Sequence, residues 1–225
     1  MNLEPDYIFI IATVFTVLFG LAYRRHNQKV MQSRAAILSD CQKMIERPEY
    51  QADSSGFARI LGQSQGLTVA LAIEVDNLTA RKLPVMWLHL TVFRSRPATE
   101  SLDILVRPQT TDIFSPSWDW AKSVTPLGGW PEHARYMTMG EPPLLQAIDN
   151  DVKTLFADKR CKELLVTPER IRLTYMARQA DRGHYLLLRA AEFDYTPIDA
   201  DEVAALLRQL QHLLVNLEEV CHEAA

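Results

Sequence analysis

An unbroken apolar run near the N-terminus is the clearest feature of the hydrophobic pattern. Residues 7–23 read YIFIIATVFTVLFGLAY, carry no charge and include ten Ile, Leu, Val or Phe residues. As a helix the run is about 25 Å long at ~1.5 Å per residue, near the lower limit for crossing a bilayer. A soluble helix normally keeps one polar face, and this run has none. It therefore predicts a transmembrane helix in contact with membrane lipid, with Tyr7 and Tyr23 at the two interfaces.

The charges that flank the run predict its orientation. Arg24, Arg25 and Lys29 follow it, whereas no Lys or Arg precedes it. The positive-inside rule then leaves the tail 1–6 outside and keeps the rest of the chain in the cytoplasm. A cleaved signal peptide is the competing interpretation, but such a peptide begins with positive charge, and this tail carries two acidic residues instead.

Apolar positions continue after the run at three- and four-residue spacing. They are Val30, Ile37, Leu38, Cys41, Met44 and Ile45. This spacing predicts a stalk helix over residues 24–47, ended by Pro48. Its apolar stripe must pack on the domain or on a second copy, so a homodimer is one expected arrangement. The predicted parts are a tail 1–6, a transmembrane helix 7–23, a juxtamembrane stalk 24–50 and a soluble domain 51–225.

Alternation of apolar and polar positions predicts strands in the soluble domain. The predicted strands are residues 69–75, 85–94, 102–106, 133–138, 161–167, 170–175 and 184–193. The tripeptide Asp181-Arg182-Gly183 predicts a tight reversal between the last two strands. Residues 53–56 favour a turn. Residues 108–131 form a long connection without a clear pattern, and such connections are often functional.

Two further helices follow from 3.6-residue periodicity. The pair Pro142-Pro143 can begin a helix whose apolar face spans residues 144–156. Asp199 is a good N-cap, and Glu202 stands where a capping box requires it. The helix after Asp199 is expected to bury Val203, Leu206, Leu207, Leu210, Leu213, Leu214 and Leu217. The predicted fold class is α+β, with an antiparallel sheet and helices packed on one face.

Composition is typical of one globular domain. Apolar residues make up 48% and charged residues 23% of the chain. The net charge of -4, with Lys and Arg spread along the chain, argues against a nucleic-acid partner. Cys41, Cys161 and Cys221 are too few and too far apart for a disulfide framework or a zinc site, so we expect them to be reduced.

No motif for catalysis, nucleotide binding or metal binding stands out. The chain has no GxxxxGK[ST], GxGxxG, GxSxG, HExxH or CxxC pattern, and its six His are scattered. A lone His on a strand, such as His89, is more often structural than catalytic. The sequence predicts no cofactor and no metal, and it favours a protein that is not an enzyme.

Two groups of side chains are candidate binding surfaces. They are Trp118, Trp120 and Trp130 in the long connection, and Arg170, Arg172 and Arg182 near the last two strands. Trp is enriched at binding surfaces, but the rings could equally form a lid over one end of the core. The Arg group could attract phosphate, anionic lipid or an acidic partner, or it could be a solvated sheet face with paired charges. Packing and surface pairing are the commoner outcomes.

One stretch of the chain carries a family resemblance. The segment KELLVTPERIRLTYMARQADRGHYLLLRAAEF, which begins at Lys162, together with LDILVRP and the apolar run, resembles uncharacterised single-pass proteins of Gram-negative bacteria. The resemblance implies a location in the bacterial inner membrane. It supplies no functional residues.

Three functional hypotheses follow. The first is a membrane-tethered cytoplasmic interaction or scaffold domain, which a flat, closed surface with an exposed apolar patch would favour. The second is a binding module for an anionic lipid headgroup or a small anionic ligand, which a shallow basic groove would favour. The third is an enzyme with a site assembled from distant residues, which a deep pocket with His or carboxylates would favour.

Overall fold

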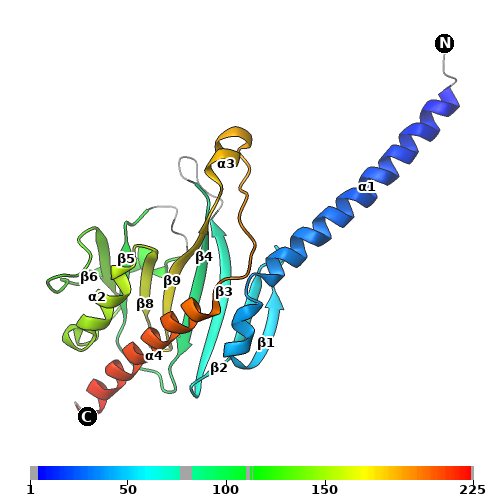
Figure 1. The fold of residues 1–225 in the computed structure, drawn as a ribbon. Helices are drawn as coiled ribbons and strands as arrows, with labels where there is room; N and C mark the ends of the chain where they lie inside the picture. Colours follow the sequence, from blue (N-terminus) through cyan, green and yellow to red (C-terminus); the bar gives the residue numbers. More distant parts are fainter. Residues whose placement is uncertain (1–4, 77–82, 110–111, 113, 224–225) are drawn as a thin grey trace.

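An antiparallel sheet with helices packed on it forms the body of the protein (Figure 1). The structure is a computed structural model that describes all residues except 1–4, 77–82, 110–111, 113 and 224–225. The order of elements and the antiparallel pairing confirm the predicted α+β class.

The sheet runs in the order β1-β2-β3-β4-β9-β8-β5-β7-β6. The strands are β1 (Glu46–Ala52), β2 (Ala58–Ser64), β3 (Leu67–Asp76), β4 (Val85–Phe93), β5 (Leu102–Val106), β6 (Lys122–Ser123), β7 (Ala134–Thr138), β8 (Cys161–Val166) and β9 (Arg170–Gln179). The α-helices are α1 (Pro5–Ala36), α2 (Asp149–Ala157), α3 (Arg182–Leu188) and α4 (Ala200–Glu223). The 3-10 helices are η1 (Asp40–Met44), η2 (Pro116–Asp119) and η3 (Leu145–Ile148).

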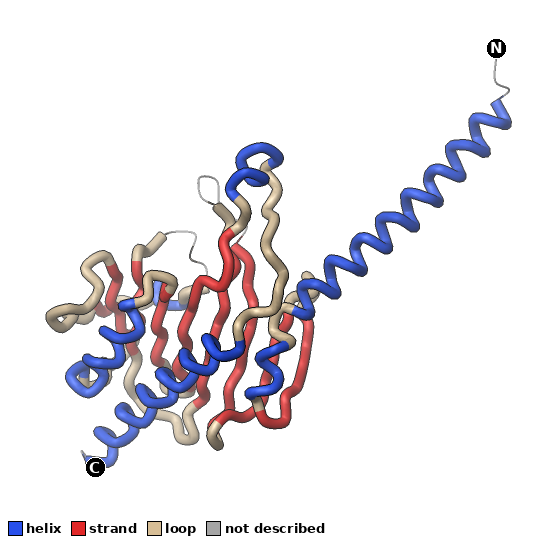
Figure 2. Tube along the Cα trace, in the orientation of Figure 1, coloured by secondary structure: helices blue, strands red, loops and turns tan. Residues whose placement is uncertain are grey.

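The helix α4 crosses one face of the sheet and closes the core (Figure 2). Its apolar positions meet side chains such as Leu71, Leu90 and Leu173, which point to the same face because strand side chains alternate. The buried residues of α4 include Val203, Leu206, Leu207, Leu210, Leu213, Leu214 and Leu217, as the periodicity predicted. Asp199 caps the helix by accepting a hydrogen bond from Asp201 N at 3.0 Å.

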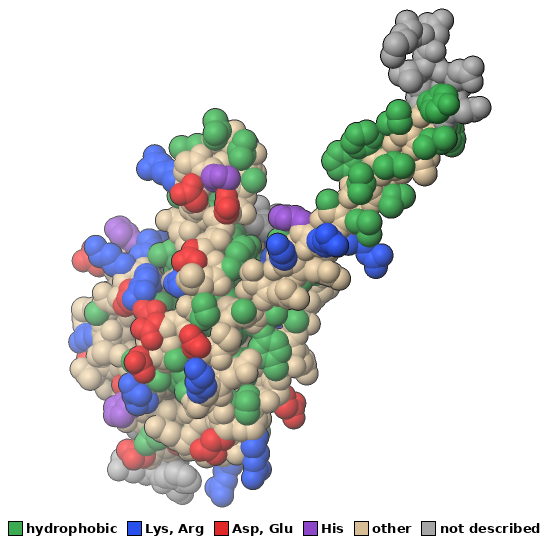
Figure 3. All heavy atoms as spheres, turned by 45° about the vertical axis from the view of Figure 1, so that its right-hand side comes forward, with side chains coloured by type: hydrophobic (Ala, Val, Ile, Leu, Met, Phe, Trp, Pro, Cys, Tyr) green, Lys and Arg blue, Asp and Glu red, His purple; other side chains and the backbone are tan. Residues whose placement is uncertain are grey.

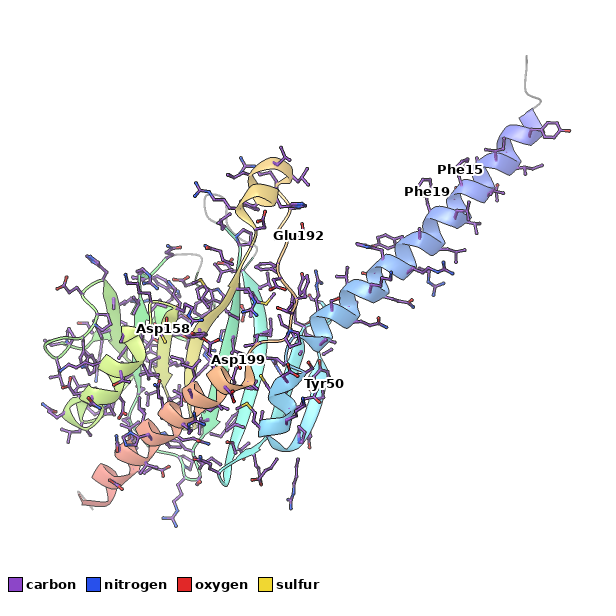
Figure 4. The ribbon with its side chains drawn as sticks, viewed as in Figure 1. Phe15, Phe19, Tyr50, Asp158, Glu192 and Asp199 are labelled. Carbon is purple, nitrogen blue, oxygen red and sulfur yellow. The ribbon has the colours of Figure 1, made fainter. Side chains whose placement is uncertain are left out.

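The helix α1 extends away from the domain as a single rod (Figure 1). Its apolar side chains are exposed, with Phe9 at 79% and Phe19 at 70%. Phe15 and Phe19 lie one turn apart on one side of the helix, with ring centroids 6.2 Å apart (Figure 4). The helical stretch Phe9–Met44 is long and apolar enough to cross a membrane, and its apolar window is not buried in the domain.

The predicted stalk helix over residues 24–47 is wrong in its second half. The helix α1 ends at Ala36, and residues 46–52 form the edge strand β1. Ile37 and Leu38 do pack into the core, where they are fully buried. The strand β1 also crosses the predicted boundary between the stalk and the domain, so this boundary does not coincide with the end of an element.

The predicted strand over residues 184–193 is also wrong. Asp181 is the N-cap of the short helix α3, and its carboxylate accepts a hydrogen bond from His184 N at 2.7 Å. The left-handed residue Arg189 (φ 55°) ends the helix. An N-cap and a turn use the same residue types, so the motif read as a reversal begins a helix instead.

The remaining predictions differ from the structure in smaller ways. The helix expected after Pro143 consists of η3 followed by α2. The strands β2 and β6 are not among the predicted strands. Glu202 does not complete a capping box, because its carboxylate accepts from Tyr175 Oη at 2.9 Å and pairs with Arg160 at 2.6 Å. The strands predicted around residues 69–75, 85–94, 102–106, 133–138, 161–167 and 170–175 are present.

Candidate functional site

The face of the sheet opposite α4 carries a row of residues that are mostly polar. We call it the second face. Cross-strand pairing aligns Gln51, Arg59, Ala72, His89, Thr174, Glu163, Leu105 and Arg135 in one continuous row across eight strands. Asp103 and Arg172 lie in the neighbouring row, paired through Leu165. Residues far apart in the sequence are thus brought side by side.

A cover segment closes the central part of the second face. It comprises residues 107–121, of which 110, 111 and 113 lie outside the described part of the chain. Asp112 forms an ion pair with Lys162 at 2.8 Å, and both side chains are nearly fully buried. Arg135 Nη2 donates to Ser117 O at 2.7 Å, and its guanidinium lies 4.6 Å from the ring centroid of Trp118. The cover segment is therefore fixed to the strands below it.

Two acidic side chains lie beneath the cover segment without exposure to solvent. Asp103 and Glu163 are both 0% exposed. Burial, and secondly the charge of Glu163, raise the pKa of Asp103 to about 8. Ser115 and Ser117 of the cover segment donate hydrogen bonds to Asp103 Oδ2 and oppose this rise. Asp103 is consequently protonated at neutral pH, which avoids burying two carboxylate charges together.

Arg172 neutralises the second acid and ties it to the cover segment. Its Nη2 donates to Glu163 Oε2 at 2.8 Å and to Phe114 O at 2.8 Å. Thr174 Oγ1 donates to the same carboxylate oxygen at 3.0 Å. A buried carboxylate requires this kind of compensation, because desolvation of an unpaired charge is costly.

A histidine links the buried acids to the open part of the sheet. His89 Nδ1 lies 3.1 Å from Thr174 Oγ1, and His89 Nε2 lies 3.1 Å from Glu74 Oε2. Because the Thr174 hydroxyl donates to Glu163, both His89 nitrogens face oxygen atoms that can accept a hydrogen bond. The hydrogen bond from His89 lowers the pKa of Glu74. The chain of contacts therefore runs from Glu163 outward to Glu74.

The second face is open over β1, β2 and β3. Burial alternates along β2, where Ile60 is fully buried and Arg59, Leu61 and Gln63 are exposed. A shallow cavity of about 360 Å³ borders this region and is lined by Arg59, Glu74 and His89 among others. The two inner acids are fully buried and do not line this cavity, whereas Glu74 at the outer end of the cluster does.

A separate basic groove lies at the end of β8. It has a volume of about 400 Å³, and Arg107, Lys153 and Lys159 line it together with His133 and Asp158. Arg107 Nη2 donates to Lys159 O at 2.9 Å, and Lys153 pairs with Asp149 at 2.7 Å. Three cationic side chains thus line this groove beside the two acidic residues Glu132 and Asp158.

The structure separates the three predicted Trp residues. Trp118 is 38% exposed over Arg135 on the second face, and Trp120 is half-buried. Trp130 is 5% exposed and packs against Tyr136 on the core face, where its Nε1 donates to Asp149 at 2.8 Å. Trp118 and Trp130 therefore lie on opposite sides of the sheet and share no surface.

The three predicted Arg residues are separated as well. Arg170 is exposed at the start of β9, Arg172 is paired with Glu163, and Arg182 lies beyond the other end of the strand on α3. At ~3.3 Å per residue, Arg170 and Arg182 lie at opposite ends of a strand about 30 Å long. Whether any of them binds an anion stays a prediction.

The sequence patterns do not single out the buried cluster, although one feature of the sequence points to it. Asp103 interrupts a strand that is otherwise apolar, and Glu163 stands beside Lys162 at the start of a second apolar strand. An acid at a buried strand position needs a partner. The partners Ser115 and Ser117 come from the patternless connection, so no spacing rule links them to Asp103. Among the residues that the structure describes, no group of His, Cys, Asp or Glu has the arrangement of a metal site.

Fold and site define an α+β protein with an exposed apolar N-terminal helix and a closed polar cluster on its sheet. No protein-family model matches the chain, and no curated protein matches it. The fold has a distant likeness to the crystal structure of the mycobacterial trehalose monomycolate transport factor A, TtfA. That likeness has 10% sequence identity and a TM-score of 0.48, and it covers 83% of this chain and 94% of the other.

Proposed function

We propose that the chain is a membrane-tethered interaction domain that holds a protein partner at the cytoplasmic face of the inner membrane. The apolar part of α1 would span the bilayer, with the tail 1–6 outside. Arg24, Arg25 and Lys29 support this orientation by the positive-inside rule. The partner would be a protein of the same membrane, because the tether keeps the domain within reach of it.

The observation that carries the proposal is the uncovered second face of β1, β2 and β3. The cover segment stops short of these strands, and their second-face side chains are exposed or half-buried. Leu61 and Ala70 provide a small apolar centre, with Arg59, Gln63 and Thr68 as a polar rim. An apolar centre within a polar rim is the usual composition of a protein interface.

The face of these strands suits a partner better than their edge does. An exposed edge strand can accept an added strand, and β1 is exposed along its whole length. However, Pro48 and the bulge between Glu46 and Glu49 interrupt half of that edge. Strand addition would therefore be confined to Glu49–Ala52, whereas the face offers a continuous surface.

A comparison of two substitutions on exposed aliphatic residues tests the proposal. Leu61→Glu places a charge in the open face, whereas Val215→Glu places the same charge on the outer side of α4, where Val215 is 46% exposed. The tagged full-length protein is crosslinked in membranes, extracted and purified, and its partners are identified and quantified. We expect Leu61→Glu to lower partner recovery at least about tenfold, which corresponds to ~1.4 kcal/mol, and Val215→Glu to leave it unchanged.

Two outcomes would contradict this function. One is equal recovery of the same partner with both variants. The other is the absence of any reproducible protein partner, together with stoichiometric retention of a small molecule by the purified protein.

The basic groove favours a second candidate function, the binding of a phosphate-bearing ligand. Arg107 and Lys159 project around one cavity, and cations gathered in a concave site attract anions. The double variant Arg107→Ala/Lys159→Ala should abolish a chemical-shift response to inorganic phosphate, whereas Lys43→Ala on η1 should retain it. If the chemical shifts of the wild type do not respond to phosphate, this second candidate function is wrong. The proposed interaction function is unaffected by that result.

A further inference from the structure

The short helix α3 ends in an exposed apolar tip. Leu186, Leu187 and Leu188 are 57%, 82% and 60% exposed, and no residue of α3 is buried. We call these three residues the leucine tip. Figure 3 shows hydrophobic side chains gathered at the top of the lobe that α3 forms. Contiguous exposed apolar side chains on a domain mark an interaction site rather than a solvated surface.

An arm that consists of α3 and residues 189–198 carries the leucine tip. The base of this arm contacts the C-terminal end of α1. Ile198 N donates to Ile37 O at 2.9 Å. The Tyr195 ring lies 6.5 Å from the Phe57 ring, and the Arg34 guanidinium of α1 lies 4.9 Å from the Phe57 centroid. Higher up, Asp181 N donates to Glu192 O at 2.8 Å and joins the two sides of the arm; Figure 4 marks Glu192 between α3 and the domain. These contacts set the direction of the arm relative to α1.

The leucine tip rises on the side of the domain toward which α1 extends (Figures 1 and 3). Measured from the Ile37–Ile198 contact, α1 climbs roughly 20 Å to Tyr23 at ~1.5 Å per residue. The return side of the arm, residues 189–198, spans up to roughly 30 Å when extended. The arm is therefore long enough to bring the leucine tip to the level at which α1 would enter the bilayer.

The charges around the tip fit a membrane surface. Arg189 directly follows the three leucines at the C-terminal end of α3 and is exposed, whereas Arg182 lies at the N-terminal end, where Asp181 and Glu192 are acidic. Arg24 and Arg25 stand at the base of the apolar part of α1, where Figure 3 shows basic side chains gathered. Anionic headgroups attract basic residues next to a membrane, and short amphipathic segments insert only as far as the headgroup region.

We propose that the leucine tip inserts into the leaflet that α1 enters, beside anionic lipid headgroups, and so forms a second membrane contact. One anchor allows the domain to rotate and tilt, whereas two contacts fix which face it turns to the membrane. A weak contact suffices, because the tether already holds the tip at a high effective concentration near the bilayer. This inference rests on α1 spanning the membrane, as the proposed function does.

Spin labels on the full-length protein test the insertion. Leu187→Cys reports on the tip, Val14→Cys on the middle of the apolar part of α1, and Lys43→Cys on η1, where the Lys43 side chain is 84% exposed. The background carries Cys221→Ser, and the protein is placed in nanodiscs of mixed phosphatidylcholine and phosphatidylglycerol. We expect the labels at 187 and 14 to be more accessible to oxygen, which dissolves in lipid, than to a water-soluble nickel chelate. The label at 43 should show the reverse ratio.

The three labels distinguish failure of this inference from failure of the anchor. A water-exposed label at 187 with a lipid-exposed label at 14 would overturn the leucine-tip contact and leave the anchor intact. Spin–spin broadening at 187 between two labelled copies would assign the tip to a second protein chain and would also overturn it. A water-exposed label at 14 would overturn both. Thermal unfolding of each labelled variant, compared with the unlabelled protein, confirms that the label leaves the fold intact.

Discussion

At the residue scale, Asp103 holds a proton that the unfolded chain releases. Its pKa is about 8 in the fold against an ordinary 3.8. Because the folded pKa is the higher one, its contribution to stability is complete below about pH 4 and is lost as the pH rises to about 8. The slope of such a loss is about 1.4 kcal/mol per pH unit for one proton.

Asp103→Asn should remove this pH dependence, since the amide keeps the shape of the protonated acid without its charge. We expect the free energy of unfolding of the wild type to fall between about pH 5 and 8, and that of the variant to stay nearly level there. Asp119→Asn, at an exposed position in η2, is the control and should retain the wild-type slope. Urea unfolding at several pH values measures the free energy of unfolding of the wild type and both variants. If that of Asp103→Asn falls with pH as steeply as that of the wild type, Asp103 is not the group that binds the proton.

Arg172 and Glu163 provide a second residue-scale prediction. Arg172→Met leaves the fully buried Glu163 without its cation, which should cost roughly 3–5 kcal/mol of unfolding free energy. Glu163→Gln added to this variant removes the stranded charge and should recover part of the loss. A double-mutant cycle measures the coupling between the two sites. Strict additivity of the two substitutions would show that the pair is not coupled.

At the element scale, Gly62 allows β1 to lie against β2. A Cβ at this position would lie 2.8 Å from Glu46 O and would also collide with the Ile45 side chain. Because backbone cannot move aside as a side-chain end can, Gly62→Ala should shift β1 and cost about 1–3 kcal/mol. Amide hydrogen exchange in Glu49–Ala52 should accelerate while exchange in α4 changes little. Gly128→Ala, which meets nothing within 4 Å, is the matched control and should leave both unchanged.

The elements that the sequence predicted are those whose side chains repeat on one face. The seven buried apolar positions of α4 and the alternation in β3 and β9 follow directly from helix and strand periods. The strand β1 has no such alternation, because all its residues are exposed and Arg47 adopts a left-handed conformation (φ 51°). Its identity comes from pairing with β2, which a single segment does not encode.

The apolar run of α3 shows a different limit of sequence reasoning. Short apolar runs fit a strand and a helix equally well, and long-range contacts decide between them. Long-range contacts also determine the buried cluster, which therefore cannot be predicted from local sequence. Asp103, Glu163 and His89 lie on three strands, and only the sheet order brings them together. Their individual positions were visible in the sequence, but their adjacency was not.

At the scale of the whole molecule, the charges around α1 should decide which side of the membrane holds the domain. The charge-exchanged variant carries Glu4→Lys, Asp6→Lys, Arg24→Gln, Arg25→Gln and Lys29→Gln. Because orientation follows the Lys and Arg residues next to the span, this variant should place a measurable fraction of chains with the domain outside. The wild type should show the domain in the cytoplasm only.

A cysteine at position 43 reports the side on which the domain lies. Cys41 and Cys161 are buried, and burial raises their pKa values to about 11 and about 12, so neither reacts readily with maleimide at neutral pH. With Cys221→Ser, Lys43→Cys becomes the reactive thiol. When the residues around the span are unchanged, a membrane-impermeant maleimide should label this thiol only after the membrane is opened. With the charge exchange added, intact cells should also be labelled. Labelling in intact cells of the protein with unchanged flanking charges would contradict the proposed orientation of the domain. Any partner of the open face would then have to be sought on the other side of the membrane.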